Sequence, residues 1–177
     1  QKLRGDFLQQ CVEKCFPLDL LEISGCKGFT PGNLVLIRDL PLTCFAASNC
    51  PSLDSKIVQQ VFCGTTTLSN TLERLSLAGN NQLSNSALSR VTHMRKLRFL
   101  NLGRLPKLGK DTLLSIAERL DELTDLLISR SHCDDEVLCI LSKRVHNLHQ
   151  VDVSKCRRVT DAGLAQLALL AQLEILL

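Results

Sequence analysis

The chain has no tryptophan and no tyrosine, and six phenylalanines are its only large aromatic residues. Proteins that bind single-stranded nucleic acid stack the bases on aromatic side chains, so such platforms are poorly supplied here. The excess of positive over negative charge is also small, because 21 basic side chains against 18 acidic ones leave a net charge of +3. A surplus this small does not by itself indicate a nucleic-acid partner.

Long apolar runs and catalytic signatures are missing as well. No run of about 18 uncharged apolar residues occurs, so no transmembrane helix and no membrane insertion are predicted. The opening residues, QKLRGDFLQQC, lack the apolar stretch of a secretory signal. The sequence contains no glycine-rich phosphate loop and no G-x-S-x-G, and no second pair completes a zinc site with Cys11 and Cys15. We therefore expect a protein that is not an enzyme and has no metal and no cofactor.

Cysteine, in contrast, is abundant and odd in number, with nine residues. We interpret most of them as buried, reduced thiols that pack like small apolar side chains. No N-x-S/T glycosylation signal is present. Both observations favour an intracellular, reducing compartment, meaning the cytoplasm, the nucleus or an organelle matrix.

The dominant feature is a repeated unit, L-x-x-L-x-L-x-x-C, whose last position is also filled by Asn, Leu or Ser. Successive copies are 24, 30, 25, 26, 25 and 25 residues apart. A repeat of this period predicts a solenoid, in which each unit buries its apolar face against its neighbours. The copies begin at Leu18, Leu42, Leu72, Leu97, Leu123, Leu148 and Leu173.

Each unit predicts a strand followed by a helix. In the sixth copy, LHQVDVSKC alternates apolar and polar residues, which is typical of a strand with one buried face. In the segment after it, Leu164 and Leu167 share one face of a helix, and Thr160 stands at the N-cap position. Alternating strands and helices indicate a parallel sheet with helices on its outer side. The equivalent N-cap residues are Thr30, Asp54, Ser84, Gly109 and Asp134, and the equivalent helix pairs are Leu34 and Ile37, Val58 and Val61, Leu88 and Val91, Leu113 and Ile116, and Leu138 and Leu141.

The pattern divides the chain into two parts. Residues 1–17 are predicted to be the helical half of an N-terminal repeat, with Leu8 and Cys11 as core residues. Residues 18–177 are predicted to be the repeat domain, with about six full repeats and a truncated seventh. The longer connection at 63–71 is expected to form a surface loop. Solenoid ends normally carry a polar cap, so the apolar last strand suggests a fragment of a longer protein or an end covered by another chain.

The unit resembles the cysteine-containing class of leucine-rich repeats, most clearly in LHQVDVSKCRRVTDAGLAQLALL and also in LERLSLAGNNQLSNSALSRV. The resemblance implies an α/β solenoid shaped as a horseshoe or arc, with parallel strands on the concave face and helices on the convex face. Proteins of this class include the substrate-binding parts of F-box proteins, which are receptors of SCF ubiquitin ligases. They also include adaptor and assembly factors without an F-box.

Alternate side chains of each strand are expected to point away from the core and to form a protein-binding concave face. Phe99 and Leu127, on adjacent strands, form an apolar patch rimmed by charged residues, unless a register error places them in the core. The seventh position of every unit is small, which would either admit a partner closely or relieve crowding. The predicted protein-binding residues are Leu20, Glu22, Arg74, Ser76, Phe99, Asn101, Asp125, Leu127, Gln150 and Asp152, and the small column is Ser24, Ser48, Ala78, Gly103, Ser129 and Ser154.

A basic cluster is the remaining candidate surface. It falls at strand starts and in strand-to-helix loops, and is either a solvated rim or a dock for acidic protein or RNA. Its members are Arg95, Lys96, Arg98, Arg104, Lys107, Lys110, Arg157 and Arg158.

These observations favour a non-catalytic scaffold or subunit that binds a protein partner through the arc within a larger assembly. The first alternative is the substrate-recognition arm of an SCF-type F-box ubiquitin ligase. The second is a structural component of a ribonucleoprotein, in which nucleic acid would be the partner.

Overall fold

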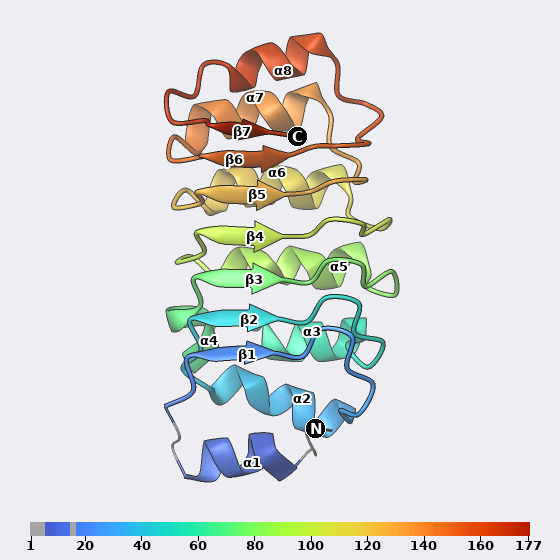
Figure 1. Ribbon diagram of the computed structural model, residues 1–177, viewed down its shortest axis with the longest axis vertical. Coiled ribbons are helices and arrows are strands. Elements are labelled where there is room, and N and C mark those ends of the chain that lie inside the picture. Colours follow the sequence, from blue (N-terminus) through green and yellow to red (C-terminus); the bar gives the residue numbers. More distant parts are fainter. Residues whose placement is uncertain (1–5, 15–16) are drawn as a thin grey trace.

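A computed structural model describes residues 6–14 and 17–177. Its centre is one open sheet of seven parallel strands, whose spatial order follows the order of the chain (Figure 1). Neighbouring strands pair without offset, so that Leu21 faces Phe45 and Phe45 faces Leu75. The strands are β1 (Leu20–Glu22), β2 (Cys44–Ala46), β3 (Arg74–Ser76), β4 (Phe99–Asn101), β5 (Asp125–Leu127), β6 (Gln150–Asp152) and β7 (Ile175–Leu176).

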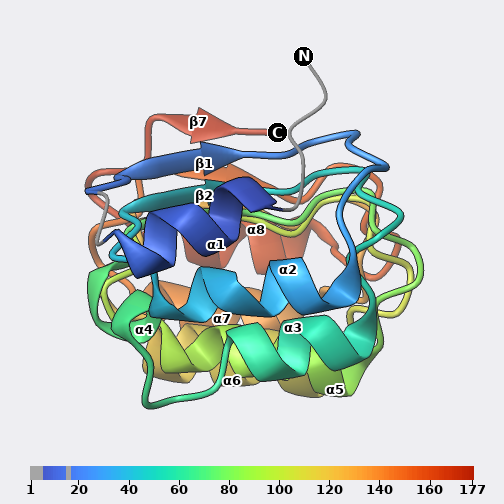
Figure 2. The same cartoon turned by 90° about the horizontal axis from the view of Figure 1, so that it is seen from below.

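Helices lie on the opposite side of the solenoid from the strands (Figure 2). The predicted α/β arc is therefore confirmed, with the strands on its concave face. In the described residues, no helix has both the length and the apolar character needed to cross a membrane. The helices are α1 (Asp6–Glu13), α2 (Pro31–Val35), α3 (Ser55–Val61), α4 (Thr67–Thr71), α5 (Asn85–Leu88), α6 (Lys110–Arg119), α7 (Asp135–Arg144) and α8 (Asp161–Leu167), with 3₁₀ turns η1 (Leu36–Asp39) and η2 (Ser89–His93).

The predicted N-caps are confirmed in all six repeats. Five of them accept a backbone N–H through the side chain, whereas Gly109 caps α6 without a side-chain bond. The helices of the first and third repeats are shorter than expected and continue as η1 and η2. Their sequences, LIRD and SRVTH, contain β-branched residues and Ser, which are weaker helix formers than Ala or Leu.

One continuous core runs between the sheet and the helices. The middle residue of each of the first six strands points into it, and none of these six is more than 4% exposed. The predicted helix pairs are buried as well, except Leu164, which is half-buried. Leu8 and Cys11 of α1 join the same core, while the division of the chain at residue 17 stays a prediction. The six strand residues are Leu21, Phe45, Leu75, Leu100, Leu126 and Val151.

Asn80 closes the turn between β3 and α5 from a buried position. Its side-chain oxygen accepts the Cys50 N–H at 2.7 Å, and its amide donates to the carbonyls of Ala47 at 2.7 Å and Leu77 at 2.8 Å. The residue itself is 1% exposed. A single side chain therefore satisfies three backbone groups that belong to two successive repeats.

The eighth position of every repeat has a left-handed backbone, with φ between +50° and +74°. Its N–H extends the sheet ladder past the strand, as when Asn49 donates to Ala78 at 2.9 Å. This left-handed position was not predicted from the sequence. It is filled, in chain order, by Gly25, Asn49, Gly79, Arg104, Arg130 and Lys155.

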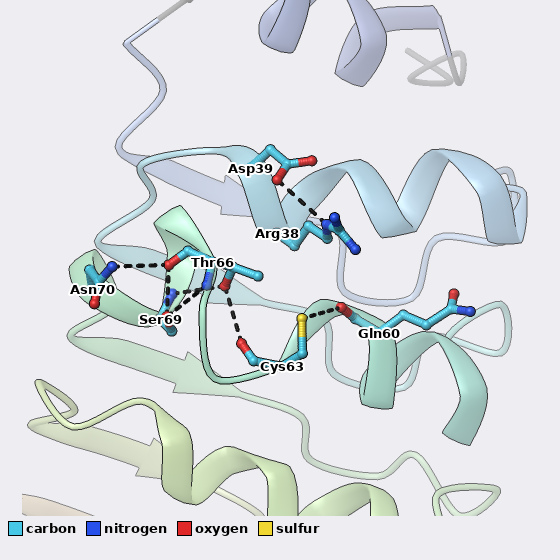
Figure 3. A network of polar contacts seen from close by, with 7 residues as sticks. All are labelled: Arg38, Asp39, Gln60, Cys63, Thr66, Ser69 and Asn70. Atoms are coloured by element: carbon cyan, nitrogen blue, oxygen red, sulfur yellow. Dashed lines mark hydrogen bonds and ion pairs between the residues drawn. The ribbon is translucent and has the colours of Figure 1, made fainter.

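Only the start of the connection at 63–71 is the predicted surface loop, with Gly64 and Thr65 exposed, and the rest is helical. The helical part is the one-turn helix α4, whose capping box joins Thr66 and Ser69 reciprocally, with Ser69 N to Thr66 Oγ1 at 3.2 Å and Thr66 N to Ser69 Oγ at 3.1 Å (Figure 3). Leu68 is fully buried. The insertion thus contributes an apolar side chain to the core, and its polar backbone is satisfied locally.

The cysteines are less uniformly buried than predicted. All eight in the described residues are free thiols, and Cys15 lies outside those residues. Cys50 and Cys133 are buried, and burial raises the pKa of both thiols. Four of the eight are only half-buried, namely Cys26, Cys44, Cys63 and Cys139. Cys44 faces outward from β2, and Cys26 lies at the turn near the open end of the sheet.

Candidate protein-binding face

The concave face of β3 to β6 carries two rows of outward side chains. The first row consists of the residues at the third position of each repeat, and the second row consists of those at the fifth position. The strand register pairs Phe99 with Asp125 and Asn101 with Leu127, so Phe99 and Leu127 are diagonal neighbours. Both are partly exposed, while Leu100 and Leu126 between them are buried. The rows are Arg74, Phe99, Asp125 and Gln150, and Ser76, Asn101, Leu127 and Asp152.

The ring of Phe99 is less accessible to a partner than a fully exposed apolar side chain would be. The guanidinium carbon of Arg74 lies 4.3 Å from the centroid of its ring. A cation over an aromatic face is attracted by the ring quadrupole and covers part of the apolar surface. The apolar patch therefore consists of Leu127 and of Phe99, whose ring is partly covered by the Arg74 side chain from β3.

A hollow of about 260 Å³ opens beside Leu127 on the same face. It brings three of the predicted binding residues, Asn101, Leu127 and Asp152, together with part of the small column. The other lining residues come from the turns after the strands. The hollow is lined by Asn49, Ala78, Gly79, Asn101, Gly103, Arg104, Leu127, Ser129 and Asp152.

The polar groups around this hollow are held by local hydrogen bonds. Asn101 Oδ1 accepts the N–H of Gly103 at 3.0 Å. In β6, Asp152 Oδ1 accepts both the N–H of Ser154 at 2.8 Å and its hydroxyl at 2.6 Å. Bonds from a side chain to the backbone two residues on restrict its rotamers. The rim of the hollow is therefore preorganised without a ligand.

Crowding explains part of the small column. A Cβ at Gly103 would lie 2.9 Å from Ser129 Oγ and 3.3 Å from Asn101 Oδ1. Two serines of this column also bond across the strands, since the N–H of Ser48 donates to Ser24 Oγ at 3.1 Å. Ser48 Oγ also lies 2.8 Å from the hydroxyl of Ser76, a fifth-position residue of the next repeat. At Gly103 the small residue relieves a close approach within the sheet, which is one of the two interpretations of this column.

Leu20 and Glu22 lie apart from this centre. They occupy β1, and β2 separates them from Arg74 and Ser76 in β3. Leu20 is 57% exposed. The predicted residue set thus contains one group on β3 to β6 and a separate pair at the N-terminal end of the sheet.

The predicted basic cluster is divided between opposite edges of the sheet. Arg95 and Arg98 lie where β4 begins. Arg95 Nη1 donates to the carbonyl oxygen of Arg119 at 2.8 Å, and Arg98 Nη2 lies 3.9 Å from Glu122 Oε2. Lys110, at the start of α6, binds Asp134 at 2.6 Å, and this hydrogen bond, together with one to Glu136, raises the pKa of the ammonium group. Arg104, Lys107, Arg157 and Arg158 lie where the strands end. Arg130 and Lys155 belong with them, and their shared eighth position in the repeat was the signal that the sequence analysis missed.

Solved structures with the same architecture include two internalins, which are leucine-rich-repeat proteins. The internalin inlF from Listeria monocytogenes matches with a TM-score of 0.61 and 19% identity, over 89% of this chain and 47% of its own. The internalin C2 (inlC2) from the same species matches with a TM-score of 0.64 and 17% identity, over 94% and 73%.

A chain of the Rad7 and Elc1 complex from yeast matches with a TM-score of 0.63 and 16% identity, over 98% of this chain and 52% of its own. The protein therefore spans about half the length of inlF and of the yeast chain. At these identities the likeness shows the leucine-rich-repeat fold alone. No protein-family profile matches the sequence.

Proposed function

We propose that this protein is a non-catalytic interaction scaffold that binds a protein partner through the concave face of β3 to β6, within a larger assembly. The observation that carries the proposal is the hollow beside Leu127, where an apolar side chain is surrounded by preorganised polar groups. Interfaces commonly combine an apolar anchor with a polar rim in this way. We also assign the chain to the cysteine-containing class of leucine-rich repeats, on the residues of its best repeat.

A substrate-recognition arm of a ubiquitin ligase is the second candidate. The likeness to a chain crystallised in the Rad7 and Elc1 complex favours it, because that chain shares the fold and belongs to a complex. For either function we propose an intracellular, reducing compartment, since all eight cysteines in the described part of the chain are free thiols, which is compatible with such conditions.

Replacing Leu127 with serine is expected to weaken partner binding at least about tenfold, because the anchor of the face would be lost. The free energy of unfolding should change by less than about 1 kcal/mol, since the side chain is partly exposed. The measurement is a pull-down from native extract with quantitative mass spectrometry, paired with thermal unfolding. The double variant Phe99→Ser/Leu127→Ser should lose binding further.

The matched control is Leu20→Ser, which removes a more exposed leucine from β1. Proteins retained by the wild type and by Leu20→Ser but lost by Leu127→Ser would support the proposal. An identical set of proteins bound by all three would contradict it. A large fall in melting temperature for Leu127→Ser would show that this residue belongs to the core.

A further inference from the structure

Three successive repeats place a basic residue where the backbone disfavours one. Position eight is left-handed in every repeat, and the first three repeats fill it with Gly25, Asn49 and Gly79. Glycine and asparagine are the residues that adopt this conformation most readily, whereas a larger side chain is strained there. The next three repeats have Arg104 (φ 59°), Arg130 (φ 58°) and Lys155 (φ 61°). Backbone strain that the fold itself does not require points to a function for the side chain.

These three residues are in register with one another. The N–H of Arg104 donates to the carbonyl of Ser129 at 2.8 Å, and the N–H of Arg130 donates to the carbonyl of Ser154 at 2.9 Å. Each bond links position eight of one repeat to position seven of the next. Neighbouring strands lie about 4.8 Å apart, so the three cationic side chains form a ladder about 10 Å long at the edge where the strands end.

The charge on this edge is not neutralised within the protein. Lys107, Arg157 and Arg158 flank the ladder, and all six side chains are exposed. In residues 6–14 and 17–177, no carboxylate oxygen lies within 4.0 Å of any of the six, although other basic residues do form such pairs. Like charges on adjacent strands repel each other. The ladder therefore adds electrostatic repulsion to backbone strain.

A second hollow lies against the ladder. It has a volume of about 670 Å³, and its charged or titratable lining residues are all basic: Arg130, His132, Lys155, Arg157 and Arg158. A concave surface lined by one sign of charge concentrates the field and attracts groups of the opposite sign. Arginine in particular binds carboxylates through paired N–H donors.

We propose that this basic ladder, Arg104, Arg130 and Lys155 with Lys107, Arg157 and Arg158, is a docking site for an acidic segment of a partner protein. A ladder of about 10 Å matches about three residues of an extended peptide. No Phe, Tyr or Trp lines the hollow, and these are the side chains on which single-stranded nucleic acids commonly stack their bases. Arg104 also lines the hollow beside Leu127, whereas the other five ladder residues lie outside that hollow. Leu127→Ser leaves all six basic side chains in place, so it can abolish binding at the concave face without removing the ladder.

The decisive variant is Arg104→Asn/Arg130→Asn/Lys155→Asn, which installs the residue that the second repeat already uses at this position. A fluorescein-labelled peptide of eight glutamates is titrated with the full chain, and anisotropy is followed at low and at physiological salt. We expect the variant to bind at least tenfold more weakly than the wild type. Its melting temperature should be unchanged or higher, because asparagine relieves the backbone strain.

The control is Arg95→Asn/Lys96→Asn/Arg98→Asn, which also removes three positive charges, but near the other ends of the strands. It should bind the peptide as the wild type does. Equal losses in the two variants, or no binding by the wild type, would overturn the proposal. So would a fall in melting temperature of the ladder variant, because the basic residues would then serve the fold. Tighter binding of an eight-nucleotide single strand, lost in the ladder variant, would instead assign the site to nucleic acid.

Discussion

Replacing Asn80 with alanine is expected to lower the free energy of unfolding by about 4 kcal/mol, because each of three buried backbone groups left unpaired costs roughly 1–3 kcal/mol. The groups are the Cys50 N–H and the carbonyls of Ala47 and Leu77, which Asn80 binds at 2.7 to 2.8 Å. The position is 1% exposed, so solvent does not reach these groups in the intact fold. The expected fall in melting temperature is about 10 °C for a chain of this size.

Chemical unfolding followed by circular dichroism measures this effect. Asn81→Ala is the matched control, because it changes the same residue type one position along at an exposed site, where we expect less than about 0.5 kcal/mol. Asn80→Cys introduces the residue found at this position in three other repeats. A loss below about 1 kcal/mol for Asn80→Ala would show that water replaces the amide, since a bridging water can satisfy such groups.

Replacing Phe45 with alanine should destabilise the protein by about 4 kcal/mol, within the range of roughly 3–5 kcal/mol for removing a large aromatic side chain from a core. Phe45 is fully buried in β2, and its ring centroid lies 6.4 Å from that of Phe62, at an interplanar angle of 58°. Alanine would lose this tilted aromatic pair and leave a cavity.

Phe45→Leu is the control that the protein itself provides, because five other strands (β1, β3, β4, β5 and β7) carry leucine at this position. We expect it to cost less than about 1.5 kcal/mol, since the leucine fills most of the volume. Equal destabilisation by Leu and Ala would mean that the aromatic contact, and not the volume, stabilises this layer. Hydrogen exchange on both variants shows which backbone amides lose protection. We expect this loss to centre on the second and third repeats, because repeats of a solenoid contact only their neighbours.

The regular part of the fold could be predicted from the sequence because it rests on short-range patterns. Alternation around Leu100 and Leu126 identifies strands and their buried faces, and Thr160 or Asp134 before an apolar stripe identifies helix starts. These signals recur six times, so each copy supports the others. Except for the half-buried Leu164, the predicted core residues are buried.

The exceptions depend on contacts that lie outside the repeat pattern: a local capping box in α4, and a contact between neighbouring strands at Phe99. The helix α4 forms because Thr66 and Ser69 cap each other while Leu68 reaches the core, and TTTLSNT read alone is typical of a loop. The cover over Phe99 comes from the rotamer of Arg74 on the neighbouring strand. Which surface binds a partner is not encoded in the repeat pattern, so the binding residues stay a prediction.

The strict succession of strands also has a mechanical consequence. Elements that share extensive contacts belong to the same or to adjacent repeats, and the strands from β1 to β7 lie in the sheet in the order of the chain. Tension applied between α1 and β7 would therefore pass through all repeats in series. Every repeat would bear the full force, so the weakest one would yield first and lengthen the molecule while the others kept their structure.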